Sequence, residues 1–204
     1  MSMSEASSMV TDEEFKGETS FEDEHEAFAA SRSTDFVYVP NTDRAFAALD
    51  KHAETIELDA KPPLVVLGDP GSGKSALLAN WVRRRRRHKH REEFLFQHFV
   101  GCGARSKQLR PLLRRLLAAL NDFFQLRLDV PLDEDRLIWS LSRFLTAAAR
   151  KSAVPRIVVV IDGVDGVRGS RGSPEGALHW LPMHLPAGVR FLISTVEFER
   201  GRGG

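Results

Sequence analysis

A glycine-rich octapeptide is the segment of this sequence with the clearest capacity for chemistry. Gly68-Asp-Pro-Gly-Ser-Gly-Lys-Ser75 fits the pattern G-x-x-x-x-G-K-[S/T]. Its glycines allow a tight turn whose backbone N–H groups point inward, and a helix that starts at Lys74 directs its positive end to the same place. The pattern predicts a P-loop: Lys74 would reach the β- and γ-phosphates of a nucleotide, and the Ser75 hydroxyl would bind Mg²⁺. The alternative is a structural glycine turn, which the flanking strand and helix make improbable. The predicted nucleotide-binding residues here are Gly68, Asp69, Pro70, Gly71, Ser72, Gly73, Lys74, Ser75 and Ala76.

Two acids follow an apolar run about ninety residues after the P-loop. The run Arg156-Ile-Val-Val-Val-Ile-Asp162 is rich in β-branched residues, as in a strand that is buried on both faces. Asp162 then ends a Walker B strand and holds Mg²⁺ directly or through water, while Asp165 orients or deprotonates the attacking water. The alternatives are an ordinary Asp-Gly turn for Asp162 and a solvated turn acid for Asp165.

Two polar residues end a further apolar run, Val189-Arg-Phe-Leu-Ile-Ser194-Thr195. At the end of a strand, Ser194 or Thr195 could sense the γ-phosphate or position water. Ser and Thr also end strands without a catalytic role, and the sequence leaves both interpretations open.

The pattern around these motifs alternates strands with helices. Strands are predicted at 64–67, 94–100, 157–161 and 190–195, and amphipathic helices at 74–87, 107–124 and 133–151. This order predicts an α/β fold, a three-layer P-loop NTPase with a parallel sheet and helices on both faces. No helix follows the last strand, so we expect the domain to be truncated there and the chain to be the front part of a longer protein.

Four segments are predicted. Residues 1–22 are acidic and rich in Ser and Met, and are expected to be disordered. Residues 23–63 form a linker with helical segments near 23–32 and 43–56. Residues 64–199 form the NTPase domain, and 200–204 form a tail.

Composition limits the other functions. The chain has 204 residues, 42% of them hydrophobic, a formal net charge of +1 and one cysteine, Cys102. No secretory signal is predicted, and the longest apolar run, Ile157–Ile161, is far too short to span a membrane, so we expect a cytoplasmic protein. The histidines show no zinc spacing with Cys102. Cys102 itself, between two glycines, is interpreted as a small loop residue.

A basic run occupies residues 83–91, Arg-Arg-Arg-Arg-Arg-His-Lys-His-Arg. Cations at a helix C-terminus interact favourably with the helix dipole and are solvated there. A solvated helix end is therefore the preferred interpretation of this run. A nuclear signal or a nucleic-acid patch is the alternative. Because no aromatic residue is interleaved for stacking, nucleic acid is an improbable partner.

The sequence also resembles the NACHT-like NTPase domains of nephrocystin-3 and related proteins, over residues 23–198. The resemblance rests on Gly68–Ser75, on Asp162–Asp165 and on Leu178–Thr195 with its Trp-Leu-Pro and Leu-Pro steps. The segments His25–Arg32 and Val37–Pro40 resemble what precedes the P-loop in that family.

This resemblance implies a signal-transduction ATPase of the STAND type, related to AAA+ proteins, whose Walker A and Walker B strands are not adjacent. ATP would close such a module and promote its assembly, and hydrolysis would reset it. Tyr38 and Pro40 become candidate contacts to the adenine. Protein partners would bind through regions beyond this chain, and the family makes the cilium a possible site of action.

Two departures from the family pattern predict slow hydrolysis. Gly166 stands where a second acid often follows Asp165, and Val196-Glu197 stands where an arginine usually follows the sensor strand. The predicted function is therefore ATP binding with slow Mg²⁺-dependent hydrolysis in a regulatory switch, with Lys74, Asp162 and Asp165 as catalytic residues.

Two other functions stay open, and so does the choice between ATP and GTP. One is a scaffold that binds nucleotide without turnover. The other is a kinase-type phosphotransferase, which would need an arginine-rich lid. The arginines of residues 103–115 alternate with leucines, as on an ordinary amphipathic helix.

Overall fold

A parallel four-stranded sheet forms the centre of the fold. The computed structural model describes residues 21–34, 36–55, 61–87, 93–151, 156–169 and 178–196. The strands are β1 (Leu64–Gly68), β2 (Glu93–Phe99), β3 (Arg156–Asp162) and β4 (Val189–Val196). They lie in the order β1-β4-β3-β2, and every pair is parallel. The predicted α/β fold is confirmed, and β4 separates the strand of the P-loop from the strand that ends at Asp162.

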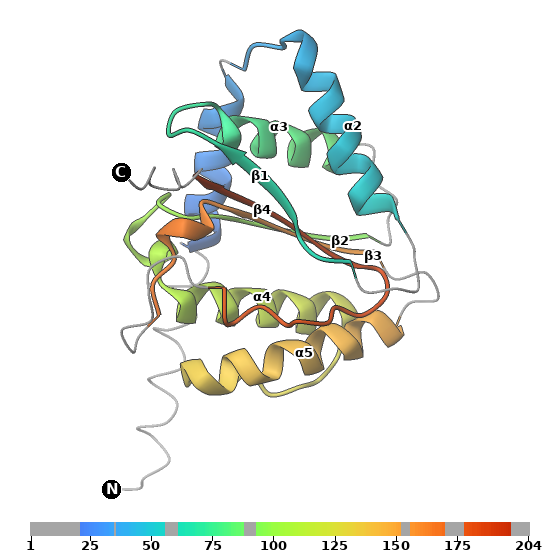
Figure 1. Ribbon diagram of the computed structural model, residues 1–204. Helices are drawn as coiled ribbons and strands as arrows, with labels where there is room; N and C mark the ends of the chain where they lie inside the picture. The colour runs from blue at the N-terminus through green and yellow to red at the C-terminus, as the bar shows by residue number, and fades with distance from the viewer. Residues whose placement is uncertain are drawn as a thin grey trace, which may run out of the picture.

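Helices cover both faces of this sheet. Figure 1 shows α2 (Pro40–Glu54) and α3 (Lys74–Arg87) on one face, and α4 (Leu109–Phe124) and α5 (Glu134–Lys151) on the other. The side chains of β3 alternate between the two cores. Val158 and Val160 pack with α2 and α3, while Ile157, Val159 and Ile161 pack with α4 and α5. A strand buried on both faces needs such a continuous apolar run, which is why the sequence pattern identified it.

Two helix starts have clear local causes. Pro40 opens α2, where its missing N–H is not needed, and the Thr42 hydroxyl accepts a hydrogen bond from Val39 N at 3.2 Å. The helix thus starts three residues before the predicted 43–56. At α5, Asp133 Oδ1 accepts a hydrogen bond from Arg136 N at 3.1 Å, as an N-cap does.

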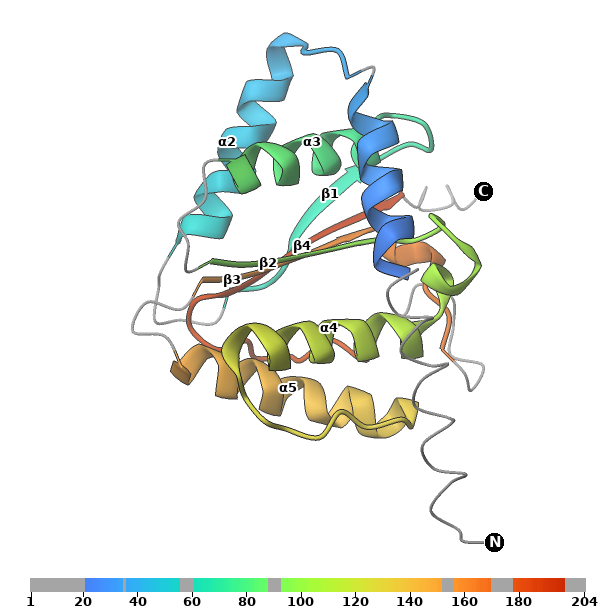
Figure 2. The ribbon, with the colours of Figure 1, turned by 180° about the vertical axis from the view of Figure 1, so that it is seen from behind.

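A further helix, residues 21–34, covers the free edge of β2, beside α3 (Figure 2). The Phe99 N–H at this edge donates to His25 Nδ1 at 3.1 Å. The helix includes Phe21, which is buried, and Glu22, which pairs with Arg115 of α4. These two residues were expected in the disordered N-terminus, residues 1–22. Because Phe21 is buried, the ordered part of the chain extends at least two residues further toward the N-terminus than predicted. Residues 1–20 and 197–204 lie outside the described part of the chain.

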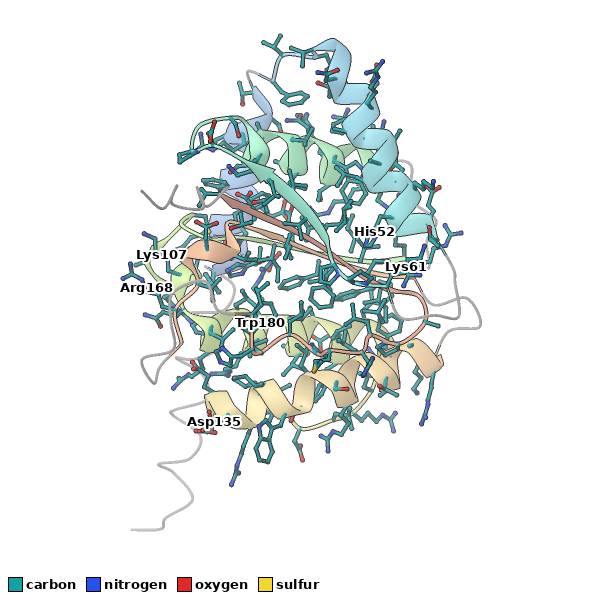
Figure 3. The ribbon with its side chains drawn as sticks, viewed as in Figure 1. His52, Lys61, Lys107, Asp135, Arg168 and Trp180 are labelled. Atoms are coloured by element: carbon teal, nitrogen blue, oxygen red, sulfur yellow. The ribbon has the colours of Figure 1, made fainter. Side chains whose placement is uncertain are left out.

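The Trp-Leu-Pro stretch before β4 has a packing role. Trp180 is buried and lies between the sheet and the α4 and α5 layer (Figure 3). Nearby, the segment after the 3-10 turn η2 (Val164–Gly166) meets the end of the 3-10 turn η1 (Ala104–Lys107), where Arg168 N donates to Lys107 O at 2.7 Å. None of the helices in the described ranges is long and apolar enough to cross a bilayer.

Candidate nucleotide-binding site

The P-loop joins the end of β1 to the start of α3. Gly71 and Gly73 have φ angles of 80° and 91°, which L side chains rarely adopt. A Cβ at Gly68 would meet Ser72 Oγ at 2.8 Å, so this glycine allows a close approach within the loop. The three glycines of the motif are therefore required by the loop conformation, and Pro70 lies in its turn.

Lys74 crosses this loop. Its Nζ donates hydrogen bonds to Gly68 O at 2.7 Å and to Asp69 O at 2.8 Å. The ammonium is thus fixed against the loop backbone, beside the N-terminal turn of α3, whose first N–H groups lack helical partners. Positive charge and free N–H groups gather at one point, which suits a phosphate group.

The strand register brings Asp162 and Ser194 together. Ile161 of β3 lies opposite Ile193 of β4, so the next residues of the two strands, Asp162 and Ser194, are neighbours at the same sheet edge. Ser194 Oγ donates to Asp162 Oδ1 at 2.5 Å, and both side chains are buried. Since β1 ends beside β4, with Gly68 opposite Val196, the P-loop emerges at this same edge.

Asp165 and Thr195 lie at this edge too. Asp165 Oδ1 accepts a hydrogen bond of 3.3 Å from Val196 N, so its carboxylate is held against the end of β4. The hydroxyl of Thr195 donates only a long contact of 3.4 Å, to Val196 O. Ser194 is therefore the better placed of the two predicted sensor residues for contact with Asp162.

A cavity of about 810 Å³ opens over the P-loop. Polar groups of Gly68, Asp69, Ser72, Gly73 and Lys74 line one part of it. Apolar side chains line another part, and they come from three regions of the chain: Phe36, Val37, Val39, Val66 and Leu77. A cavity lined both by the P-loop with its lysine and by apolar side chains has the character of a nucleotide site.

Tyr38 lies next to this cavity but does not line it. Its ring packs against Phe36 and Phe46, at centroid distances of 5.2 and 5.9 Å, and 59% of the residue is exposed. Val37 and Val39 on either side do line the cavity, as does Ala76 of α3. The side chain of Pro40 lies outside what the structure describes. The proposed adenine contact of Tyr38 stays a prediction.

Ser75 and Asp162 supply the kind of donors that Mg²⁺ prefers, a hydroxyl and a carboxylate oxygen. Ser75 follows Lys74 in the first turn of α3, and Asp162 ends β3. Of the described residues, no group of three or more His, Cys, Asp or Glu side chains forms a metal site. The donor set therefore fits a cation that is shared with phosphate oxygens rather than one held by protein alone.

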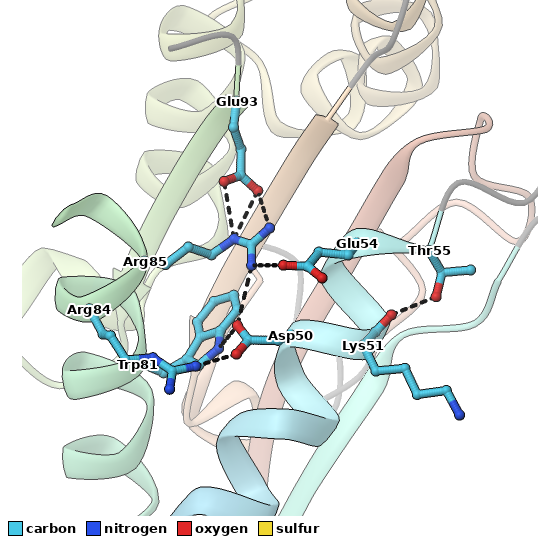
Figure 4. Close-up of polar contacts among 8 residues, drawn as sticks. All are labelled: Asp50, Lys51, Glu54, Thr55, Trp81, Arg84, Arg85 and Glu93. Atoms are coloured by element: carbon cyan, nitrogen blue, oxygen red, sulfur yellow. Dashed lines mark hydrogen bonds and ion pairs between the residues drawn. The ribbon is translucent and has the colours of Figure 1, made fainter. Parts of the chain in front are cut away.

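Within the basic run after the P-loop, arginines of α3 form ion pairs that join parts of the fold, a role that sequence reasoning missed (Figure 4). Arg85 is buried, and its Nε and Nη2 bind the Glu93 carboxylate at 2.8–3.0 Å. Its Nη1 contacts Asp50 Oδ1 at 3.3 Å and Glu54 Oε1 at 3.4 Å. Burial lowers the pKa of Arg85, but the hydrogen bonds and charge of Glu93, together with the charges of Asp50 and Glu54, outweigh burial and raise this pKa above its ordinary value. The guanidinium thus joins α3 to α2 and β2.

A second buried cluster joins helix 21–34 to β2. The rings of His25 and His98 lie 4.3 Å apart, and His98 Nε2 donates to Ser106 O at 2.8 Å. Burial and, less strongly, Arg115 lower the pKa of His25 to about 3. Burial also lowers the pKa of His98. Cys102 Sγ lies 3.2 Å from His25 Nδ1. Burial raises the pKa of the Cys102 thiol, in keeping with an unreactive loop thiol.

A P-loop between a buried strand and a helix, with an acid at the end of a non-adjacent parallel strand, defines a P-loop NTPase. Residues 42–193 match the family of AAA ATPase domains, and the chain belongs to that family. It is therefore a nucleotide-binding NTPase domain.

Relatives of this chain are much longer proteins. Nephrocystin-3 of Mus musculus is 31% identical over 66% of this chain and 10% of its own length. A TPR repeat-containing protein of Dictyostelium discoideum is 21% identical over 70% of this chain and also 10% of its own length. Among solved structures, a chain of "Structure of Drosophila ORC bound to DNA" matches with a TM-score of 0.49 at 14% identity, over 86% of this chain and 44% of that one.

Proposed function

We propose that this chain is the ATP-binding module of a regulatory switch of the NACHT/STAND type, with slow Mg²⁺-dependent hydrolysis. One observation carries the proposal: the cavity of about 810 Å³ joins the P-loop to an apolar wall that includes Phe36 and Val39. A triphosphate fits the first part and a base fits the second. The similarity to nephrocystin-3 supports the finer assignment to NACHT-like domains.

Each predicted residue has a distinct part in this proposal. Lys74 neutralises charge on the β- and γ-phosphates, together with backbone N–H groups of the loop. Ser75 and Asp162 hold Mg²⁺, which supplies further neutralisation of phosphate charge when bound. The hydrogen bond from Ser194 fixes the direction of the Asp162 carboxylate, and Asp165 orients the attacking water. Catalysis is then positioning and electrostatic stabilisation, with no covalent intermediate.

The transferase alternative finds little support. The arginines of the segment 103–115 would have to form a lid over the phosphates. Arg105, Arg110, Arg114 and Arg115 instead line a separate cavity beside helix 21–34, together with Phe21. A scaffold that binds nucleotide without turnover remains the second candidate, because Gly166 replaces an acid that often follows Asp165 in the resembling family.

Calorimetry on the purified chain tests the binding step. ATP and GTP, each with Mg²⁺, are titrated into the unmodified chain, into Lys74→Ala and into a control, Lys107→Ala, which removes an exposed lysine of η1. The proposal expects ATP to bind, Lys107→Ala to bind equally and Lys74→Ala to bind at least about tenfold more weakly, since a charge-assisted contact is worth about 1.5–3 kcal/mol. Equal binding by all three proteins would refute the site.

Turnover then separates the switch from the scaffold. Phosphate release that depends on Mg²⁺ and is lost in Asp162→Asn supports the ATPase. Binding without release supports the scaffold, and a phosphorylated acceptor among the products supports the transferase. We further propose that ATP binding promotes self-association, that protein partners bind through the remainder of a longer protein, and that the module works in the cytoplasm. Sedimentation with and without nucleotide tests the first of these.

A further inference from the structure

A second cavity, of about 500 Å³, lies between helix 21–34 and α3. We call it the arginine groove. Arg83, Arg86 and Arg87 line it from α3, Ala29 and Ser33 line it from helix 21–34, and Gln97 lines it from β2. Its residues differ from those of the P-loop cavity, to which helix 21–34 contributes Ser31 and Arg32. The same helix thus borders two separate hollows.

Gln97, one of the residues that line this groove, carries an unsatisfied acceptor. Its Nε2 donates to Glu26 Oε1 at 2.7 Å, and Glu26 also accepts two hydrogen bonds from Arg86, at 2.8 and 3.1 Å. A carboxylate only accepts hydrogen bonds, so the amide nitrogen of Gln97 must face Glu26 and the orientation of its amide is fixed. Gln97 is 1% exposed, and its Oε1 has no hydrogen-bond donor within the described chain. Buried acceptors without a donor are rare in folded proteins, and a bound molecule that carries a donor would satisfy this one.

The groove also carries unneutralised positive charge. Glu26 pairs with Arg86, but Arg83 and Arg87 are exposed and have no carboxylate partner in the ranges that the structure describes. Ala29 and Ser33, which line the groove from helix 21–34, have small side chains. A planar guanidinium binds phosphate in a bidentate manner, which gives it a preference for phosphate oxygens over a simple charge contact.

We propose that the arginine groove is a binding site for a small phosphate-bearing molecule that also carries an N–H or O–H donor. Arg83 and Arg87 bind the phosphate, and Gln97 Oε1 accepts the donor. The volume suits a molecule of metabolite size. A single-stranded nucleic acid is disfavoured, because the groove residues include no aromatic ring on which a base could stack.

Inorganic pyrophosphate is the probe for this site. It is titrated into the ¹⁵N-labelled chain and followed in NMR spectra through the side-chain signals of Gln97, Arg83 and Arg87. The P-loop amides, such as that of Gly73, report the nucleotide site in the same spectra. The two sites are thereby observed separately, so a failure of one proposal is distinguishable from a failure of the other.

The comparison uses two double variants with equal loss of charge. Arg83→Ala/Arg87→Ala removes the groove cations, and Arg136→Ala/Arg143→Ala removes two exposed arginines of α5. We expect saturable shifts of the Gln97 side chain, unchanged in the α5 variant and at least about tenfold weaker in affinity in the groove variant. Absent or non-saturable shifts, or an equal loss of affinity in both variants, would overturn the proposal. An equal loss in both variants would mean that pyrophosphate is attracted by the overall charge of the chain and not by the groove.

Discussion

The Ser194 hydroxyl donates a hydrogen bond of 2.5 Å to the Asp162 carboxylate, across the two central strands of the sheet. The same oxygen accepts a hydrogen bond of 2.8 Å from Gly163 N. Because a hydroxyl has one proton, the bond to Gly163 and the bond to Asp162 together fix its direction. A buried acid is thus held in one orientation by a residue more than thirty positions away.

Replacing Ser194 by Ala should slow ATP hydrolysis more than it weakens ATP binding. The Asp162 carboxylate loses a charge-assisted hydrogen bond, worth about 1.5–3 kcal/mol, and with it a fixed orientation. We expect kcat to fall about tenfold or more and KM to change by less than about threefold. Steady-state phosphate release measures both. Thr195→Val is the matched comparison: its hydroxyl makes only the 3.4 Å contact, so its effect should be smaller. Equal effects of the two variants would contradict this role of Ser194.

Replacing Arg85 by Met should destabilise the fold. Glu93, 2% exposed, would remain as a buried carboxylate without its cation, a loss that costs about 3–5 kcal/mol. Urea unfolding, followed by the fluorescence of the buried Trp81 and Trp180, measures the free energy of unfolding. Arg83→Met, on the exposed side of the same helix, should change it by less than about 0.5 kcal/mol.

The double variant Arg85→Met/Glu93→Met completes this test. It removes both charges, so it should recover much of the stability that Arg85→Met loses. A double variant no more stable than Arg85→Met would mean that the loss comes from other contacts of the Arg85 side chain, rather than from an unpaired Glu93 charge.

Replacing Gly73 by Ala should weaken nucleotide binding at the P-loop. A Cβ at Gly73 meets no atom within 4 Å, so the cost lies in the φ of 91°, about 1–2 kcal/mol for an L residue. Relief of this strain would turn the loop N–H groups away from the phosphates. We expect an affinity for ATP about tenfold lower by calorimetry. Gly101→Ala introduces a similar strain, at a φ of 95° in the turn after β2 and outside the P-loop cavity, and should keep the affinity within about twofold.

Acidification should destabilise the chain through His25 and His98. The fold lowers the pKa of both histidines, that of His25 to about 3. In the unfolded chain they take up protons below about pH 6.5, whereas in the folded chain they stay neutral. The unfolded state then binds more protons, and stability falls as the pH falls from 6.5 toward 3. Each histidine contributes a slope of about 1.4 kcal/mol per pH unit. Above pH 6.5 this contribution is constant.

Urea unfolding between pH 7 and 5 measures this slope, in a range above the titration of most carboxylates. The charged side chains around the pair are Arg115, which disfavours protonation, and Glu22, which pairs with Arg115. His25→Gln should reduce the slope by about 1.4 kcal/mol per pH unit, and His179→Gln, which changes an exposed histidine, should leave it unchanged. Part of the remaining slope comes from His52, whose pKa burial also lowers. A slope unaffected by His25→Gln would exclude this cause.

The sequence by itself determined the P-loop, the four strands and the helices that follow them. Gly71 and Gly73 are demanded by local backbone geometry, and the apolar run before Asp162 by burial on both faces of a sheet. Such features depend on residues that are near in the chain, so composition and periodicity reveal them. Helix 21–34 was predicted as well, over residues 23–32, which is two residues shorter at each end.

The tertiary structure alone decided which of these residues meet. Ser194 reaches Asp162 because β4 lies beside β3, an order that no periodicity encodes. The sequence pattern predicts Arg85 to be one solvated cation in a basic run. In the structure Arg85 is buried, because α2, which precedes it in the chain, brings Asp50 to it and β2, which follows it, brings Glu93. Gln97 becomes an unsatisfied acceptor only when helix 21–34 packs over β2. Contacts between distant segments depend on the packing of whole elements, and a linear pattern carries no record of that packing.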